Sequence, residues 1–216
     1  MELYVKKILF FLIPFLVTST IIISAQQTGN PEKGKALYAI CVTCHGQQGE
    51  GNKDLNSPRL TGQHDWYLIR QLKNFKEGIR GTNPKDLFGM QMRPMALTLA
   101  DDQMILDVVA YINTLQLPDS AVTAETVPGN PEKGKAAYVI CTTCHQQNGE
   151  GNKALNAPRL SGLQGWYLTQ QLKNFKEGIR GSNPKDLFGM QMKPMALTLP
   201  DDQAIQDVVA HIKTLK

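Results

Sequence analysis

Two cysteines three residues apart, followed directly by a histidine, occur twice in the chain. Residues 41–45 read Cys-Val-Thr-Cys-His, and residues 141–145 read Cys-Thr-Thr-Cys-His. With this spacing the two thiols can bond to the two vinyl groups at one porphyrin edge while the adjacent imidazole turns onto the iron, which is why C-x-x-C-H is the attachment signature of c-type haem. The sequence therefore predicts two covalently bound haem c groups. Their attachment residues and proximal iron ligands are Cys41, Cys44, His45, Cys141, Cys144 and His145.

Three other uses of these cysteines fit the sequence less well. A structural zinc site needs four protein ligands, and each motif supplies only two cysteines and one histidine. A thioredoxin-like redox pair is expected within a βαβ unit, whereas the residues around these cysteines have helical patterns. Disulfides are compatible with an exported chain, but they give the two histidines no role.

The chain contains the same unit twice. Residues 29–116 align with residues 129–216 without a gap, and 21 of the 88 aligned pairs differ, so 67 are identical. Units of this length are tandem globular domains rather than the short repeats of a stacked array. We expect a first domain at 26–116, a linker at 117–128 and a second domain at 129–216. Residues that each domain needs for its own function should therefore be present in both copies.

This repetition narrows the candidates for the second axial ligand of each iron. A thioether opposite the histidine would close the coordination shell. Three side chains are excluded as axial ligands because the equivalent position in the other copy holds a different residue type: His64, His211 and Met104. The methionines that survive lie at the same three positions in each copy: Met90, Met92, Met95, Met190, Met192 and Met195. With one ligand position per domain, the others are core or surface residues.

Helical patterns dominate each unit and predict an all-α fold. In the first unit a helix should begin at Pro31 after an Asn30 cap, and Asp101 and Asp102 should open a third helix. Apolar side chains at helical spacing predict the second helix, namely Leu68, Leu72, Phe75 and Ile79. Residues 82–98, rich in Pro, Gly and Met, are expected to be irregular. These small helices bury too little apolar surface alone, so each haem should complete a core.

The N-terminus predicts export. Lys6 and Lys7 precede an apolar run at 8–23, and small residues follow at Ser24 and Ala25. This is the pattern of a signal peptide at 1–25, cleaved after Ala25, and it indicates the periplasm. The alternative is an uncleaved anchor with loose membrane association, because the apolar stretch is near the shortest that spans a bilayer.

Charge excludes one large class of function. The chain of 216 residues has 23 basic and 19 acidic side chains, a formal net charge of +4. That excess is too small for a nucleic-acid-binding protein, and no basic block is present. In each copy, basic residues fall on a face of the second helix away from its apolar side chains: Lys73, Lys76, Arg80, Lys173, Lys176 and Arg180. They would be solvated, or would neutralise haem propionates or steer docking. Trp66 and Tyr67, repeated at 166 and 167, would pack on haem or in the core.

The chain resembles class I cytochrome c, specifically the dihaem cytochrome c4 type, over essentially all of the mature sequence. Besides the two C-x-x-C-H motifs, the resemblance is carried by Gly34 and Tyr38, by 58–60 (Pro-Arg-Leu), by 92–95 (Met-Arg-Pro-Met) and by 108–111 (Val-Val-Ala-Tyr). It implies two tandem class I cytochrome c domains.

The resemblance also implies roles for particular residues. Met92 and Met192 match the family's distal iron ligands, and the Pro58 and Pro158 carbonyls should accept hydrogen bonds from the proximal imidazoles. Gly34, Tyr38 and Tyr111 match a close crossing of the first and last helices. The second copy departs from this pattern at His211.

Two irons closed on both sides favour an electron carrier rather than an enzyme, and no small-molecule substrate is required. The partners expected are proteins, such as a quinol-oxidising complex as donor and a terminal oxidase as acceptor. The leading alternative is a dihaem cytochrome c peroxidase, in which one haem must open and the two distal sides should therefore differ. A second alternative is an electron-transfer subunit of a larger periplasmic dehydrogenase.

Overall fold

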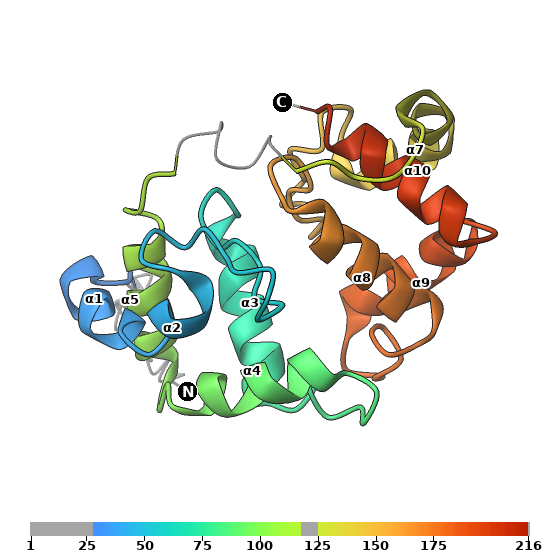
Figure 1. The fold of residues 1–216 in the computed structure, drawn as a ribbon. Helices are drawn as coiled ribbons and strands as arrows, with labels where there is room; N and C mark the ends of the chain where they lie inside the picture. The colour runs from blue at the N-terminus through green and yellow to red at the C-terminus, as the bar shows by residue number, and fades with distance from the viewer. Residues whose placement is uncertain (1–27, 118–124, 216) are drawn as a thin grey trace, which may run out of the picture.

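The chain folds into two helical units that face one another across a shared interface (Figure 1). The computed structural model describes residues 28–117 and 125–215. The first unit contains α1 (Pro31–Tyr38), α2 (Val42–His45), α3 (Asp65–Lys76), α4 (Leu87–Leu97) and α5 (Asp102–Ile112). The second contains α7 (Pro131–His145), α8 (Gly165–Lys176), α9 (Leu187–Leu197) and α10 (Asp202–Ile212). Apart from isolated bridges, the described residues form no strand, which confirms the all-α class.

The first helix begins where its sequence signals place it. The Asn30 side chain accepts a hydrogen bond from the Lys33 backbone N–H at 3.1 Å, and Pro31 occupies the first helical position. The Asn30 backbone N–H in turn donates to the carboxylate of Asp107 on α5 at 2.7 Å. The cap therefore starts α1 and also fixes it against the last helix of the unit.

The first and last helices of each unit cross in direct backbone contact. A Cβ atom built on Gly34 would lie 1.9 Å from the carbonyl oxygen of Asp107, so only glycine allows this crossing. Beside it the rings of Tyr38 and Tyr111 are 5.4 Å apart. In the second unit His211 takes the place of the outer tyrosine and packs on Tyr138 at nearly the same distance, 5.3 Å. The departure at His211 therefore leaves the crossing intact.

Residues 82–98 are not irregular throughout, contrary to the prediction from their composition. Most of them form α4, and the equivalent residues form α9. The overlooked signal is Asp86, whose side chain accepts a hydrogen bond from the Gly89 backbone N–H at 3.0 Å and caps the helix. Pro94 lies inside the helix and removes only one backbone hydrogen bond, so the helix continues past it to Leu97.

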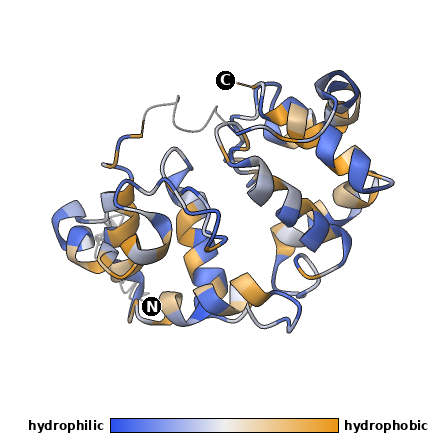
Figure 2. Cartoon of the chain, in the orientation of Figure 1, coloured by the Kyte–Doolittle hydropathy of each residue, from blue (hydrophilic) through white to orange (hydrophobic). Residues whose placement is uncertain are grey.

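Each unit has a small apolar core around its last helix. In the first unit the buried side chains that form this core are Tyr38, Leu68, Leu99, Ile105, Val108, Val109 and Ile112. Hydrophobic residues alternate with hydrophilic ones along α3, α4 and α5 (Figure 2). Many other apolar side chains line the space between the helices instead of filling it. The protein core is thus incomplete without a further hydrophobic group.

Two predicted segments lie largely outside the described residues. They are the export signal at 1–25 and most of the linker at 117–128. At the described end of the linker, Glu125 accepts hydrogen bonds from the backbone N–H groups of Gly165, at 2.6 Å, and Trp166, at 3.1 Å. Val127 packs against the core of the second unit. Across 28–117 and 125–215, none of the helices has the length and apolarity needed to cross a bilayer.

Side-chain amides join the two units. Gln63 pairs with the backbone of Arg159, accepting from its N–H at 3.1 Å and donating to its carbonyl at 2.9 Å. Gln164 accepts from the Arg59 backbone N–H at 3.0 Å and donates to the Glu50 carbonyl at 2.8 Å. Together these bonds clamp the loops that follow the two C-x-x-C-H motifs against one another.

Replacing Gln63 by leucine, the residue at position 163, should loosen this interface. The variant leaves the N–H and carbonyl of Arg159 without their partner, at a cost of about 1–3 kcal/mol. We expect the two units to separate more readily, measured as a larger radius of gyration by small-angle scattering. Gln48→Asn, an exposed change to the residue found at 148, is the matched control. An unchanged radius for Gln63→Leu would show that other contacts hold the units together.

Candidate haem sites

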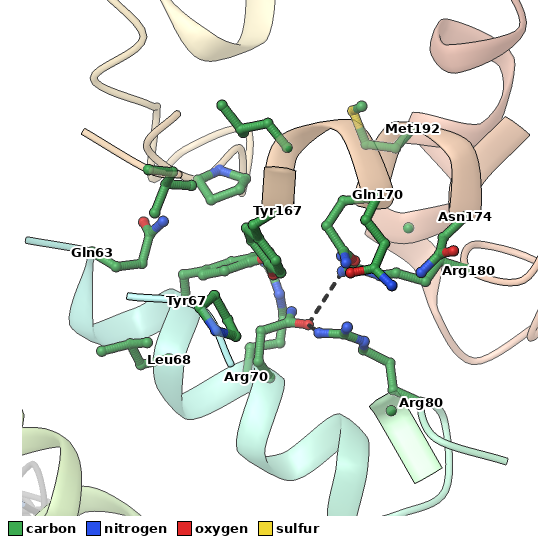
Figure 3. A pocket seen from close by; sticks show the side chains of 18 of the residues that line it. Gln63, Tyr67, Leu68, Arg70, Arg80, Tyr167, Gln170, Asn174, Arg180 and Met192 are labelled. Atoms are coloured by element: carbon green, nitrogen blue, oxygen red, sulfur yellow. Dashed lines mark hydrogen bonds between the residues drawn. The ribbon is translucent and has the colours of Figure 1, made fainter. Parts of the chain in front are cut away.

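One continuous cavity of about 330 Å³ is lined by residues of both units. The two cysteines and the histidine of each motif lie along it, and Figure 3 shows the side chains at the boundary between the units. All four cysteines are free of disulfide bonds. Burial raises the pKa of Cys41, and likewise of Cys141, to about 11, so neither thiol is a preformed thiolate. The disulfide alternative therefore finds no support.

The two histidines are held for coordination through their outer ring nitrogen. The Nδ1–H of His45 donates to the Pro58 carbonyl at 2.8 Å, and His145 makes the same bond to Pro158 at 2.8 Å. This confirms the contact implied by the resemblance. The bond fixes the tautomer and leaves Nε2 free to bind iron. Burial lowers the pKa of both imidazoles, which favours the neutral form that a metal ligand requires.

Helix α4 places two of its three methionines on the cavity. Met92 and Met95 line it, whereas Met90 does not and is 38% exposed. The second unit repeats this arrangement on α9, where Met192 and Met195 line the cavity. The structure therefore reduces the candidate methionine ligands for the distal side of each iron from three to two in each unit.

Two tyrosines approach one another at the boundary between the units (Figure 3). Tyr67 and Tyr167 line the cavity, whereas Trp66 packs edge-on against Tyr67 at a centroid distance of 6.1 Å. Burial alone would raise the pKa of Tyr67, but the positive charges of Arg180 and Arg80 outweigh it and lower that pKa. Of the two aromatic residues at the start of α3, the tyrosine is thus the one placed to contact a bound group.

The predicted set of cations has two different roles. Lys73 forms a 2.6 Å ion pair with Asp102, and Lys76 donates to the Leu99 and Ala100 carbonyls, so both tie α3 to the start of α5. Arg80, in contrast, is buried and lines the cavity. The second unit repeats this division: Lys173, Lys176 and Arg180.

The buried arginines meet across the interface around one glutamine. The Oε1 atom of Gln71 accepts from Arg80 at 2.6 Å and from Arg180 at 3.3 Å. Among the described residues, the Nε atoms of both arginines are buried without a hydrogen-bond partner. Two such donors beside an apolar cavity fit the acidic propionate edge of a haem. The residues present therefore fit a covalently bound haem in each unit.

A zinc site finds no support in the described part of the chain. Within 28–117 and 125–215, no three His, Cys, Asp or Glu side chains converge to hold a metal ion. The cysteines and histidine of each motif instead line the cavity.

Sequence reasoning missed the residues that bring the two sites together. Gln71 and Gln171 are identical in the two copies, so the repetition itself was a signal for them. Gln63 and Arg70 have Leu163 and Gln170 as their counterparts. Looking for functional residues that are identical in both copies therefore excludes these two positions.

The comparisons with known proteins agree with this geometry. The sequence model of the Cytochrome c family matches residues 31–116 and again 131–216. The cytochrome c4 of Thiocapsa roseopersicina is 34% identical over 202 residues, covering 89% of this chain and 96% of that protein. The thiosulfate dehydrogenase electron acceptor of Stutzerimonas stutzeri is 30% identical, covering 80% of this chain and 78% of that protein. Reduced recombinant cytochrome c4 from Pseudomonas stutzeri matches in structure with a TM-score of 0.67 and 28% identity, covering 88% of this chain and all of that one.

The chain therefore belongs to the cytochrome c family, as a two-domain member similar to the cytochromes c4. It binds two covalently attached haem c groups, and it is an electron carrier rather than an enzyme. These conclusions confirm the predicted fold class and cofactor.

Proposed function

We propose that each iron is held between a histidine and a methionine, in two domains at 26–116 and 129–216 joined by the linker at 117–128. The thioether bonds are assigned to Cys41, Cys44, Cys141 and Cys144, and the axial ligands to His45, Met92, His145 and Met192. Met92 is favoured over Met95 because both line the cavity but Met95 is 37% exposed, whereas Met92 is partly buried. The same preference holds between Met192 and Met195, which is also 37% exposed.

One observation carries the proposed function: both halves of the cavity present the same donors from the same elements. A histidine anchored on a proline carbonyl recurs in each unit, together with a methionine on α4 in the first unit and on α9 in the second. When bound in this way, each haem supplies reversible one-electron transfer between ferrous and ferric iron. The protein holds the imidazoles in one tautomer, surrounds each site with apolar side chains and places buried cations at its acidic edge.

We propose that the protein works in the periplasm, between a quinol-oxidising complex and a terminal oxidase. The predicted export signal and the cysteine chemistry support this location, and the similarity to cytochromes c4 supports an electron carrier. A second candidate function is electron acceptance from a periplasmic dehydrogenase. It is favoured by the similarity to a protein named as the electron acceptor of thiosulfate dehydrogenase. The peroxidase alternative is disfavoured because α4 and α9 present identical methionine pairs to the cavity.

Ligand binding to the oxidised protein tests this function. With both irons closed by a thioether, the oxidised protein should be low-spin and take up cyanide slowly at both haems. Met92→Ala and Met192→Ala should each abolish about half of the weak sulfur-to-iron absorption band at the red end of the visible spectrum, and lower the potential of one haem. A high-spin centre that rapidly takes up cyanide or peroxide in the unaltered protein would instead indicate a catalyst. Full retention of the band in both variants would move the assignment to Met95 and Met195.

A further inference from the structure

The two haem sites are lined by residues that are mostly identical in the two copies. One contact that the first unit makes with the second comes from a residue whose counterpart in the second unit differs. Position 70 on α3 is arginine, and the equivalent position 170 on α8 is glutamine. The Arg70 guanidinium reaches from the first unit into the second, where it donates to Asn156 through both of its terminal nitrogens. Nη1 bonds the side-chain oxygen of Asn156 at 2.7 Å, and Nη2 bonds its backbone carbonyl at 2.9 Å.

The same guanidinium lies against the start of the helix that carries the second unit's methionines. Its central carbon is 4.7 Å from the ring centroid of Phe188, the second residue of α9. It is also 5.3 Å from the rings of Trp66 and Tyr67 in its own unit. A planar cation between aromatic rings of two units attracts both. Arg70 therefore joins the aromatic start of α3 to the start of α9.

The residue that caps α9 adds a charge interaction. Burial lowers the pKa of Arg70, while electrostatic interactions with Tyr67 and with the Asp186 carboxylate act in the opposite direction. Asp186 is the N-cap of α9 and accepts a hydrogen bond from the Gly189 backbone N–H at 3.0 Å. In the first unit the equivalent Asp86 carboxylate has one buried oxygen, Oδ2, that finds no hydrogen-bond partner within 28–117 and 125–215. Gln170 is uncharged, so it cannot give Asp86 the favourable charge interaction that Arg70 gives Asp186.

We propose that Arg70 is a positioning residue which, from the first unit, fixes the start of α9 and thereby holds Met192 more firmly than Met92 is held. This inference rests on the proposed His/Met ligation. It makes two nearly identical domains inequivalent at the distal side, because Arg70 clamps the start of α9, whereas the equivalent position 170 carries no arginine that could clamp the start of α4. The clamp acts on the ligand-bearing helix rather than on the iron. Its loss should therefore ease displacement of Met192 without altering the proximal side.

Competition with imidazole measures how firmly each methionine is held. Imidazole displaces a thioether from oxidised iron more readily when the helix that carries the thioether is looser. In a Met92→Ala background the remaining sulfur-to-iron band reports the second haem alone, and in a Met192→Ala background it reports the first. Adding Arg70→Gln, which installs the residue found at 170, should tighten imidazole binding at the second haem roughly tenfold. Binding at the first haem should stay unchanged.

Gln170→Leu is the matched control at the equivalent position, and it should change imidazole binding at neither haem. Unchanged binding at the second haem in Arg70→Gln would overturn the positioning role. Equal tightening at both haems would also overturn it, because that result indicates a general loosening of the interface. The ligand assignment is judged separately, by whether Met92→Ala and Met192→Ala alone each lose half of the band.

Discussion

Replacing Cys41 and Cys44 together by serine should halve the haem content of the protein and unfold the first unit while the second remains folded. Without thioether bonds the haem becomes a dissociable ligand, and the first unit has only a small cluster of buried apolar side chains around α5 to replace it. A core of that size is marginal for a unit of about 90 residues. Haem absorbance per chain, the intact mass and limited proteolysis measure the effect.

The repeated unit supplies the control for this prediction. Cys141→Ser with Cys144→Ser should give the converse product, with haem retained only on the first unit. In both variants proteolysis should remove the unit that lacks haem and leave the other, because each unit has its own core cluster. A double-serine variant whose altered unit stayed folded and resistant to protease would show that the protein core alone is sufficient.

Local signals in the sequence predicted most of the fold and singled out motif residues that line the cavity. The cap at Asn30, the glycine at 34 and the C-x-x-C-H motifs act through neighbouring residues or through backbone geometry, and the structure places them as expected. The Pro and Gly content of 82–98 predicts irregular structure, but the cap at Asp86 starts a helix that runs through most of this segment. A single proline inside a helix costs one hydrogen bond, and packing can compensate for it.

The interface between the units could not be predicted by the same reasoning. Comparing the copies selects residues that each domain needs for its own haem site. It therefore favours the repeated methionines and excludes His64, whose counterpart is Gln164. Yet the His64 ring donates to the Glu150 carbonyl at 2.7 Å, across the interface. Gln164, its counterpart, bonds the Glu50 carbonyl at 2.8 Å. Several contacts between the units are therefore made by side chains at positions that differ between the copies, and their partners are distant in sequence.

Gly34→Ala should destabilise the protein by about 3 kcal/mol, because the helix crossing has no room for a side chain. The added Cβ atom would lie 1.9 Å from the Asp107 carbonyl oxygen and 2.9 Å from the Cβ atom of Tyr111. The first of these is a backbone atom of α5, which cannot move away as a flexible side chain could. Helices α1 and α5 must therefore separate, and the Tyr38 and Tyr111 rings must move with them. Denaturant unfolding followed by the haem absorbance of the first unit measures the change.

Gly62→Ala separates this clash from the general effect of replacing a glycine. Gly62 has a φ of +80°, but the nearest atom to its added Cβ would be the Arg59 guanidinium at 3.5 Å. Its cost should be about 1 kcal/mol, from the left-handed backbone alone. Gly34 has an ordinary helical backbone, so a larger loss at that position can only come from the crowding against α5. Equal losses in the two variants would mean that the helices shift apart at little cost, and that the close crossing is not needed to hold the first helix beside the haem.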